Sequence, residues 1–314
     1  MGEGDNKGMR GFYMSEKMFK ILKKIPTIFS SETLFVPMAA IILCAMFAGN
    51  AQAQSAAKNI ASPEIKEEFI EFPTDDEWNI KGRYYPATKS TWTLVLVHGQ
   101  RNSANEWKLW FPYLKEAGIG YLALDLRGHG RSLVNPVGST TTWRRFAISG
   151  LNNEYNKMVR DVEGAIAWLG EKGIPESQIV LAGTVLGANL AIKTAAIHPE
   201  IAKTIAISPA INANDVLTVN PLRTAYGKRP LLLVGGTDRD RQYRELILLN
   251  DLARLACGVG NVTVMLEYSG VGQELITKYN IKRLLAWLDN SALPPVISFE
   301  DEEQEGEPEI VDEE

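Results

Sequence analysis

Histidine and cysteine are scarce in this sequence, which has three histidines and two cysteines in 314 residues. No cluster of the two residue types has the spacing of metal ligands. Cys44 lies close to the N-terminus, in a segment that we expect to be removed, so the mature chain keeps Cys257 alone and can form no internal disulfide. We expect neither a metal nor another cofactor.

The central part of the chain also lacks a strong charge of either sign. The net charge of −5 hides ten acidic side chains and no basic one over residues 300–314, while the N-terminal 53 residues are slightly basic. The remainder is too weakly basic to indicate a nucleic-acid partner. We expect residues 299–314 to be a disordered acidic tail; the alternative is an electrostatic contact with the body or a partner.

The first 53 residues have the order of parts of a secretory signal peptide. Four lysines between positions 17 and 24 precede an uncharged apolar run over 34–47, and Ala51-Gln52-Ala53 follows as a small-x-small cleavage site. The apolar run is shorter than the ~20 residues of a membrane span, so cleavage is favoured over an uncleaved anchor. In either case we expect an extracytoplasmic protein, secreted or periplasmic, with Met14 or Met18 as alternative starts.

Between positions 54 and 298, apolar strands alternate with amphipathic helices, which predicts one α/β domain with a mostly parallel sheet of roughly eight strands. Two opening strands are expected to be antiparallel, and helices should cover both faces of the sheet. We expect strands over 69–72, 79–85, 92–97, 120–126, 178–182, 204–207, 231–234 and 262–268, and helices over 105–117, 153–170, 186–197, 243–257 and 275–288.

Three short segments follow predicted strands. Residues 97–100 read VHGQ, residues 125–132 read DLRGHGRS, and residues 182–191 read AGTVLGANLA at a strand-to-helix junction. Their order and spacing resemble the α/β-hydrolase superfamily, particularly its compact esterase and serine-peptidase-like members. The third segment corresponds to the family's G-x-S-x-G nucleophile elbow, formed here by Gly183, Thr184, Val185 and Gly187 with one intervening leucine.

The resemblance implies an oxyanion hole. Its segment is His98, Gly99 and Gln100, where the N–H of Gln100 would be one donor and the N–H of Leu186 the second. The two elbow glycines remove side chains that would obstruct the sharp turn from strand to helix.

Val185 stands where the family has its nucleophile, so the triad is degenerate. Valine has no lone pair with which to attack a carbonyl. The elbow also holds its central residue at positive φ, which is costly for a β-branched side chain. We therefore expect either strain of ~1–3 kcal/mol at Val185 or a relaxed elbow.

The family's catalytic histidine is also missing. Residues 269–274 read SGVGQE where it would lie, and the counterpart is Gln273 or Gly272, neither of which is a general base. Asp238 follows a buried strand at the acid position, although it could instead cap the next helix.

The three histidines of the chain lie elsewhere, and we consider each as a replacement for the missing base. We expect His98 to make structural hydrogen bonds and His198 to cap the end of a helix on the surface. His129 lies in the loop after the fourth strand and is a candidate for a displaced base.

These observations favour a non-catalytic protein that binds a small ligand, a peptide or an envelope component in the former substrate cleft. A variant of this hypothesis is a scaffold with a closed cleft, whose acidic tail or polar loop over 133–151 meets a partner. The alternative is an active ester or peptide hydrolase that uses Thr184 as nucleophile and His129 or Glu274 as base. A dinucleotide enzyme is excluded, because the loose glycine pattern at 118–123 precedes its strand instead of following it.

Overall fold

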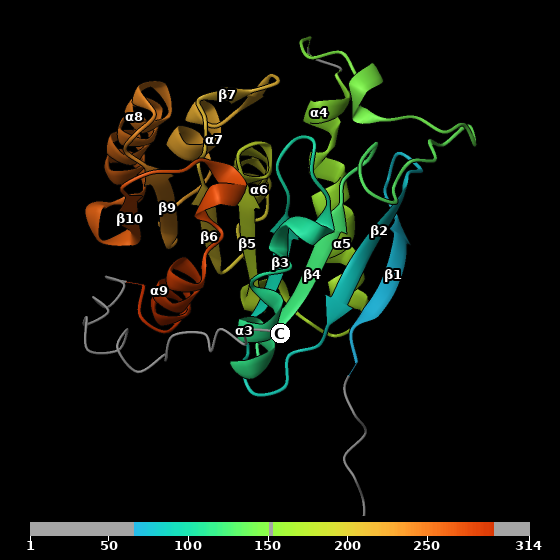
Figure 1. The fold of residues 1–314 in the computed structure, drawn as a ribbon, viewed down its shortest axis with the longest axis horizontal. Helices are drawn as coiled ribbons and strands as arrows, with labels where there is room; N and C mark the ends of the chain where they lie inside the picture. Colours follow the sequence, from blue (N-terminus) through green and yellow to red (C-terminus); the bar gives the residue numbers. More distant parts are fainter. Residues whose placement is uncertain (1–65, 151–152, 292–314) are drawn as a thin grey trace, which may run out of the picture. The chain divides into compact units, whose positions relative to one another are not determined.

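The computed structural model describes residues 66–150 and 153–291 (Figure 1). The predicted signal peptide (1–53) and acidic tail (299–314) lie outside these residues, as do the outermost residues of the predicted domain.

The centre of the fold is an eight-stranded sheet with the order β1-β2-β4-β3-β5-β6-β9-β10. β2 pairs antiparallel with both β1 and β4, and the remaining neighbours pair parallel. The strands of this sheet are β1 (Glu68–Pro73), β2 (Asn79–Tyr85), β3 (Thr93–Val97), β4 (Gly120–Asp125), β5 (Ile179–Thr184), β6 (Lys203–Ile207), β9 (Leu231–Gly236) and β10 (Val262–Glu267). The α/β class and the sheet of roughly eight mostly parallel strands are confirmed.

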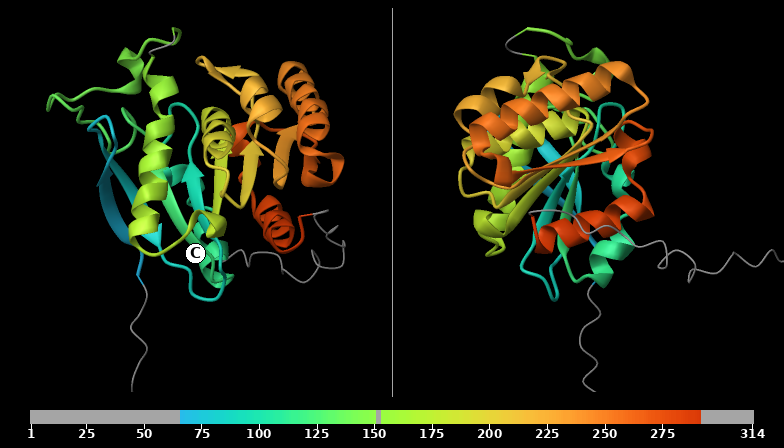
Figure 2. Two further views of the ribbon diagram at one scale, coloured as in Figure 1. Left: turned by 180° about the vertical axis from the view of Figure 1, so that it is seen from behind. Right: turned by 90° about the vertical axis from the view of Figure 1, so that its left-hand side faces the viewer.

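Helices cover both faces of the sheet, with α5, α6 and α8 on one face and α3 and α9 on the other (Figure 2). The α-helices are α3 (Phe111–Glu116), α4 (Glu154–Lys157), α5 (Val159–Glu171), α6 (Leu186–Ile197), α7 (Val219–Thr224), α8 (Asp240–Cys257) and α9 (Lys278–Asp289). The 3-10 helices are η2 (Ala104–Trp107), η3 (Trp143–Arg145), η4 (Glu176–Gln178), η5 (Val259–Asn261) and η6 (Gly272–Leu275).

The continuous apolar runs of the sequence are explained by this double cover. In β3 all five residues are buried. Leu94 and Leu96 pack toward α3 and α9, whereas Val95 and Val97 pack toward α5 and α6. Alternate side chains of one strand therefore enter two different cores, which removes the apolar–polar alternation of a strand with one wet face.

Two of the expected helices are interrupted. The helix predicted over 105–117 is divided into η2 and α3, and Pro112 lies in the first turn of α3, where its missing N–H costs no helical hydrogen bond. The helix predicted over 153–170 is divided at Met158 into α4 and α5. The helix expected from residue 275 begins instead at Lys278, after η6, with Thr277 capping its N-terminus.

Two small elements between β6 and β9 were not predicted from the sequence. These are the hairpin of β7 (Asn212–Ala213) and β8 (Val216–Leu217), and the helix α7. Strands of two residues carry too little periodicity to be predicted.

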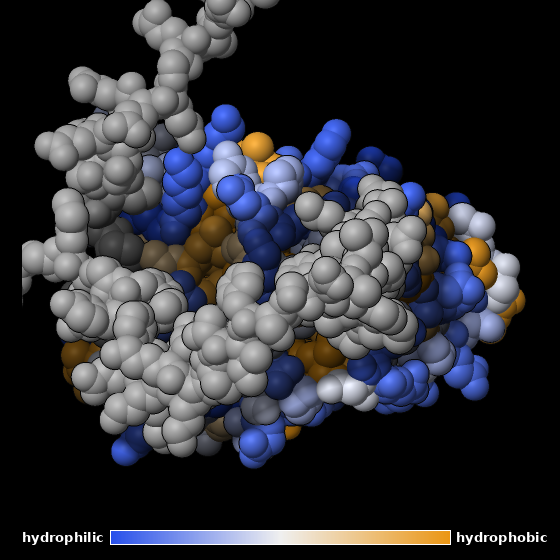
Figure 3. All heavy atoms as spheres, turned by 90° about the horizontal axis from the view of Figure 1, so that it is seen from below, coloured by the Kyte–Doolittle hydropathy of each residue, from blue (hydrophilic) through white to orange (hydrophobic). Residues whose placement is uncertain are grey.

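Polar residues dominate the described part of the face shown in Figure 3, and apolar residues appear there in separate patches. Across residues 66–150 and 153–291, no helix combines the length and the apolar character that crossing a bilayer demands.

Candidate functional site

Val185 forms the turn between β5 and α6. Its φ is 47° and its ψ is −106°, and its N–H donates to the carbonyl of Ile207 at 2.9 Å. Of the two expectations for this residue, the structure has the strained one: the sharp elbow persists with a β-branched residue at its centre.

Close packing explains why the elbow stays sharp. A Cβ atom added at Gly183 would lie 2.1 Å from the carbonyl oxygen of Gly187, and one added at Gly187 would lie 2.1 Å from that of Val97. Backbone thus lies directly on backbone at the end of β3. The same packing brings the segment of His98, Gly99 and Gln100 against the elbow.

A buried carboxyl group joins these two segments. The Oε2 atom of Glu106 accepts the N–H of Gly99, and Oε1 accepts the hydroxyl of Thr184, both at 2.7 Å. Glu106 is 5% exposed, and burial raises the pKa of its carboxyl group although both hydrogen bonds act to lower it. The sequence does not predict this role for Glu106, because one glutamate in a predicted helix carries no distinguishing pattern.

Thr184 is accordingly a supporting residue in this geometry. Its side chain is fully buried and is bonded to Glu106. The two bases considered for it have other partners: His129 Nδ1 is 3.0 Å from the carbonyl oxygen of Arg127, and Glu274 accepts the N–H of Val271 at 2.9 Å. Among the described residues, no hydrogen bond joins Thr184 to His129 or to Glu274.

Two backbone donors remain free at the elbow. Within residues 66–150 and 153–291, the N–H groups of Gln100 and Leu186 have no hydrogen-bond acceptor. Leu186 is the first residue of α6, so its N–H also carries the positive end of the helix dipole. These are the donors that the resemblance assigns to an oxyanion hole.

The loop at the histidine position lies directly on Val185. A Cβ atom added at Gly272 would be 2.8 Å from Val185 Cγ2, and the N–H of Gly272 donates to Ser208 Oγ at 2.8 Å. Gln273 points elsewhere, since its Oε1 accepts from Asn102 Nδ2 at 2.9 Å. Of the two expected counterparts of the histidine, Gly272 faces the elbow, and its position has no room for an imidazole while valine is present.

Asp238, at the acid position, is hydrogen-bonded to the loop at the histidine position. Its Oδ1 accepts the N–H of Gly270 at 3.1 Å, so it binds the loop that carries Gly272. The alternative that Asp238 caps the following helix is wrong, because α8 begins at Asp240 with Arg239 in the N-cap position.

His98 and His129 are both buried near the elbow, with ring centroids 5.0 Å apart. His98 Nε2 accepts the N–H of Leu126 at 3.1 Å, so its Nδ1 donates to the carbonyl of Gly99 at 2.7 Å. Burial lowers the pKa of His98 to about 4 and that of His129 to about 3. Both rings are therefore neutral at pH 7, and His98 ties β4 to the oxyanion segment.

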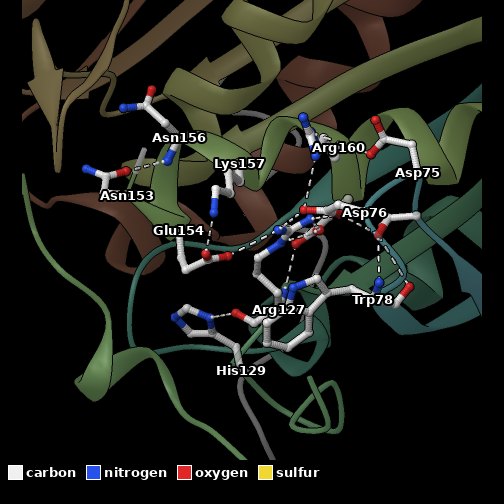
Figure 4. Close-up of polar contacts among 12 residues, drawn as sticks. Asp75, Asp76, Trp78, Arg127, His129, Asn153, Glu154, Asn156, Lys157 and Arg160 are labelled. Atoms are coloured by element: carbon white, nitrogen blue, oxygen red, sulfur yellow. Dashed lines mark hydrogen bonds and ion pairs between the residues drawn. The ribbon is translucent and has the colours of Figure 1, made fainter. Parts of the chain in front are cut away.

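Arg127 fixes the loop that carries His129 (Figure 4). Its fully buried guanidinium group forms ion pairs with Asp161 at 2.7 Å, Asp76 at 2.6 Å and Glu154 at 3.2 Å. These partners come from α5, the turn between β1 and β2, and α4 respectively. The arginine of the DLRGHGRS segment is thus a structural centre beside the site.

The polar loop predicted over 133–151 is described as far as residue 150. It contains one isolated bridge, between Val134 and Thr140, and η3. Tyr155 anchors it, because its hydroxyl accepts from Gln100 Nε2 at 2.8 Å and donates to the carbonyl of Trp143 at 3.1 Å. The loop is therefore connected to the oxyanion segment through one tyrosine.

A pocket of about 740 Å³ opens beside the site, between η2 and α3 on one side and η6 and α9 on the other. Glu106 and Gln273 contribute to its wall. In the part of the chain that the structure describes, no group of three or more histidine, cysteine, aspartate or glutamate side chains could hold a metal ion.

Comparisons with known proteins agree with this architecture. Residues 88–237 match the Hydrolase_4 family, described as serine aminopeptidase, S33. The polyketide transferase grgF of a Penicillium species is 26% identical over 175 residues, which are 54% of this chain and 51% of that protein. The chain thus spans about half the length of this curated relative.

Solved structures show the same fold at low sequence identity. An esterase from Pyrococcus furiosus has a TM-score of 0.57 and 18% identity, covering 74% of this chain and 92% of that one. The α/β hydrolase GrgF from Penicillium has a TM-score of 0.54 and 15% identity, covering 72% and 97%. A dienelactone hydrolase from Anabaena variabilis has a TM-score of 0.53 and 16% identity, covering 73% and 97%. The chain therefore has the α/β-hydrolase fold, and residues 88–237, just under half of it, match one family of α/β hydrolases.

Proposed function

We propose that this protein is a non-catalytic α/β-hydrolase-fold protein that binds a ligand in the former substrate cleft. The observation that carries the proposal is the contact of Val185 with Gly272. Acyl transfer needs a nucleophile and a base within hydrogen-bond reach of each other. Here an aliphatic side chain and a glycine occupy the two positions and pack against each other.

The hydroxyl groups near Val185 do not replace the missing nucleophile. Thr184 would have to leave Glu106 and turn out of the core, exposing a buried carboxyl group. Ser208 holds the N–H of Gly272 and has no histidine as a partner among the described residues. No histidine is bonded to either hydroxyl among the described residues, and both Thr184 and the Glu106 carboxyl group bonded to it are buried in the core, so we do not favour an active hydrolase.

The retained donors support a binding role. The free N–H groups of Gln100 and Leu186 remain at the elbow although no oxyanion would form there. Unpaired N–H groups at a helix N-terminus can bind a carbonyl, carboxylate or phosphate oxygen of a ligand. Because the leader has the order of a signal peptide, we further propose that the protein is exported and meets a small molecule, peptide or envelope component there.

The test is labelling of the purified protein with a fluorophosphonate probe, followed by peptide mapping. We expect no adduct. The variant Val185→Ser/Gly272→His restores a hydroxyl and an imidazole at the facing positions. It should be labelled at position 185 more than the matched Val185→Ser/Gln273→His variant, because residue 273 points toward Asn102.

A stoichiometric adduct of the unaltered protein on Thr184, Ser208 or another hydroxyl would refute the non-catalytic proposal and identify the nucleophile. Circular dichroism of each variant controls for loss of the fold.

A further inference from the structure

The loop over 133–150 and the residue after Gln100 carry arginines without counterions. Within the described residues, the side chains of Arg101, Arg144 and Arg145 have no hydrogen-bond or ion-pair partner, and all three are exposed. Residues 133–150 include no acidic side chain that could neutralise them. The positive charge on this loop and on the residue after Gln100 is thus available to a ligand.

Trp143 holds two of these arginines. The guanidinium carbon of Arg101 is 5.6 Å from the centre of the indole ring, and that of Arg144 is 4.9 Å away. Stacking on an aromatic ring orders a guanidinium group and leaves its N–H groups free to bind an anion. His129 also stacks on Trp143, with centroids 5.9 Å apart, which fixes the indole in turn.

The arginines lie close to the elbow through a short chain of contacts. Arg101 follows Gln100 directly, and the side chain of Gln100 reaches Trp143 through the hydroxyl of Tyr155. Arg101 also has a φ of 72°, and Val185 and Ser208, which holds the loop at Gly272, are likewise non-glycine residues at positive φ. Unfavourable backbone conformations of this kind are concentrated at functional sites.

Resting on the proposed binding function, we infer that the ligand of this cleft carries a carboxylate or phosphate group, bound by Arg101 and Arg144 beside Trp143. A planar guanidinium group matches both oxyanions in bidentate geometry. The indole edge and the half-buried Val185 provide apolar contacts for the rest of the ligand. A small amphiphilic acid fits this combination better than a neutral ester.

Isothermal titration of the full chain with three probes of similar shape tests the inference. The probes are phenylacetate, phenyl phosphate and the neutral phenylacetamide. We expect at least one anion to bind about tenfold more tightly than the amide, the usual effect of one charge-assisted hydrogen bond. Raising the salt concentration should weaken anion binding, because the arginines are exposed.

Variants assign the effect to the site. Arg101→Gln and Arg144→Gln should each raise the Kd of the preferred anion about five- to tenfold. Arg254→Gln is the matched control, because Arg254 is exposed on α8 and also lacks an ion-pair partner among the described residues; its Kd should not change.

Equal affinity for anion and amide, absence of saturable anion binding, or equal effects of all three variants would overturn the inference. The outcome is separate from that of the labelling experiment. A labelled hydroxyl would refute the non-catalytic proposal even if the anions bind, and an unlabelled protein that prefers the amide would retain that proposal without an anionic ligand.

Discussion

At Val185, one side chain without a nucleophilic atom occupies a backbone turn that is otherwise kept. The elbow is maintained by Gly183 and Gly187, whose neighbours leave no space for side chains, so the backbone at residue 185 cannot relax independently. Strain of ~1–3 kcal/mol is characteristic of such a conformation. The backbone therefore keeps the strained conformation of a nucleophile elbow, although valine cannot act as a nucleophile.

Replacing Val185 with glycine should reveal this strain. Glycine loses the contact with Gly272 but adopts a φ of 47° without cost. Val185→Gly and Val264→Gly should both reduce the free energy of unfolding, and the loss in Val185→Gly should be smaller by about 1–2 kcal/mol. Val264 is the control because it is a half-buried valine in β10. Urea unfolding measures both, and equal losses would show that Val185 is unstrained.

At the scale of elements, Arg127 binds several parts of the chain together. Its carboxylate partners belong to the turn before β2, to α4 and to α5 (Figure 4). Burying these charges is costly, and the ion pairs offset that cost only while every partner is present. Removing one partner should therefore reduce the free energy of unfolding more than removing both members of an ion pair.

Arg127→Met should destabilise the protein by about 3–5 kcal/mol, because it leaves Asp161 as a fully buried, unpaired carboxylate. Arg127→Met/Asp161→Leu should recover part of this loss, since both buried charges are then replaced by apolar groups. Chemical unfolding of the two variants provides the comparison. A double variant no more stable than the single one would contradict this interpretation of the network.

At the scale of the whole molecule, His98 and His129 make stability depend on pH. Their pKa values are about 4 and about 3 in the folded protein, because burial disfavours the charged form. The unfolded value is about 6.5. The unfolded chain thus binds more protons than the folded protein between these pH values. The contribution of the two histidines to the free energy of unfolding is therefore fully present above about pH 7 and is lost as the pH falls.

Each histidine should contribute a loss of about 2 kcal/mol between pH 7 and pH 5. In His129→Gln the fall in unfolding free energy over this range should be smaller by about that amount, as measured by urea unfolding at a series of pH values. His198→Gln is the control of opposite sign: hydrogen bonding to Glu163 and pairing with Glu176 raise the pKa of His198, so its loss should steepen the fall. An unchanged slope in His129→Gln would show that this ring titrates normally.

The sequence alone determined the architecture and the absences. Continuous apolar runs predicted strands buried on both faces, and the glycines at 183 and 187 predicted a sharp elbow, because both patterns follow from local sterics and burial. Val185 and the lack of a histidine over 269–274 are visible without coordinates.

Tertiary structure decided which residues meet. Glu106 and Ser208 were not predicted, since their roles depend on bonds to Thr184 and Gly272, which lie 78 and 64 positions away. The same applies to Gly272 facing the elbow in place of Gln273, and to the arginines stacked on Trp143. Local patterns specify strands, helices and turns, but contacts between distant loops are set only when the sheet has brought those loops to one edge.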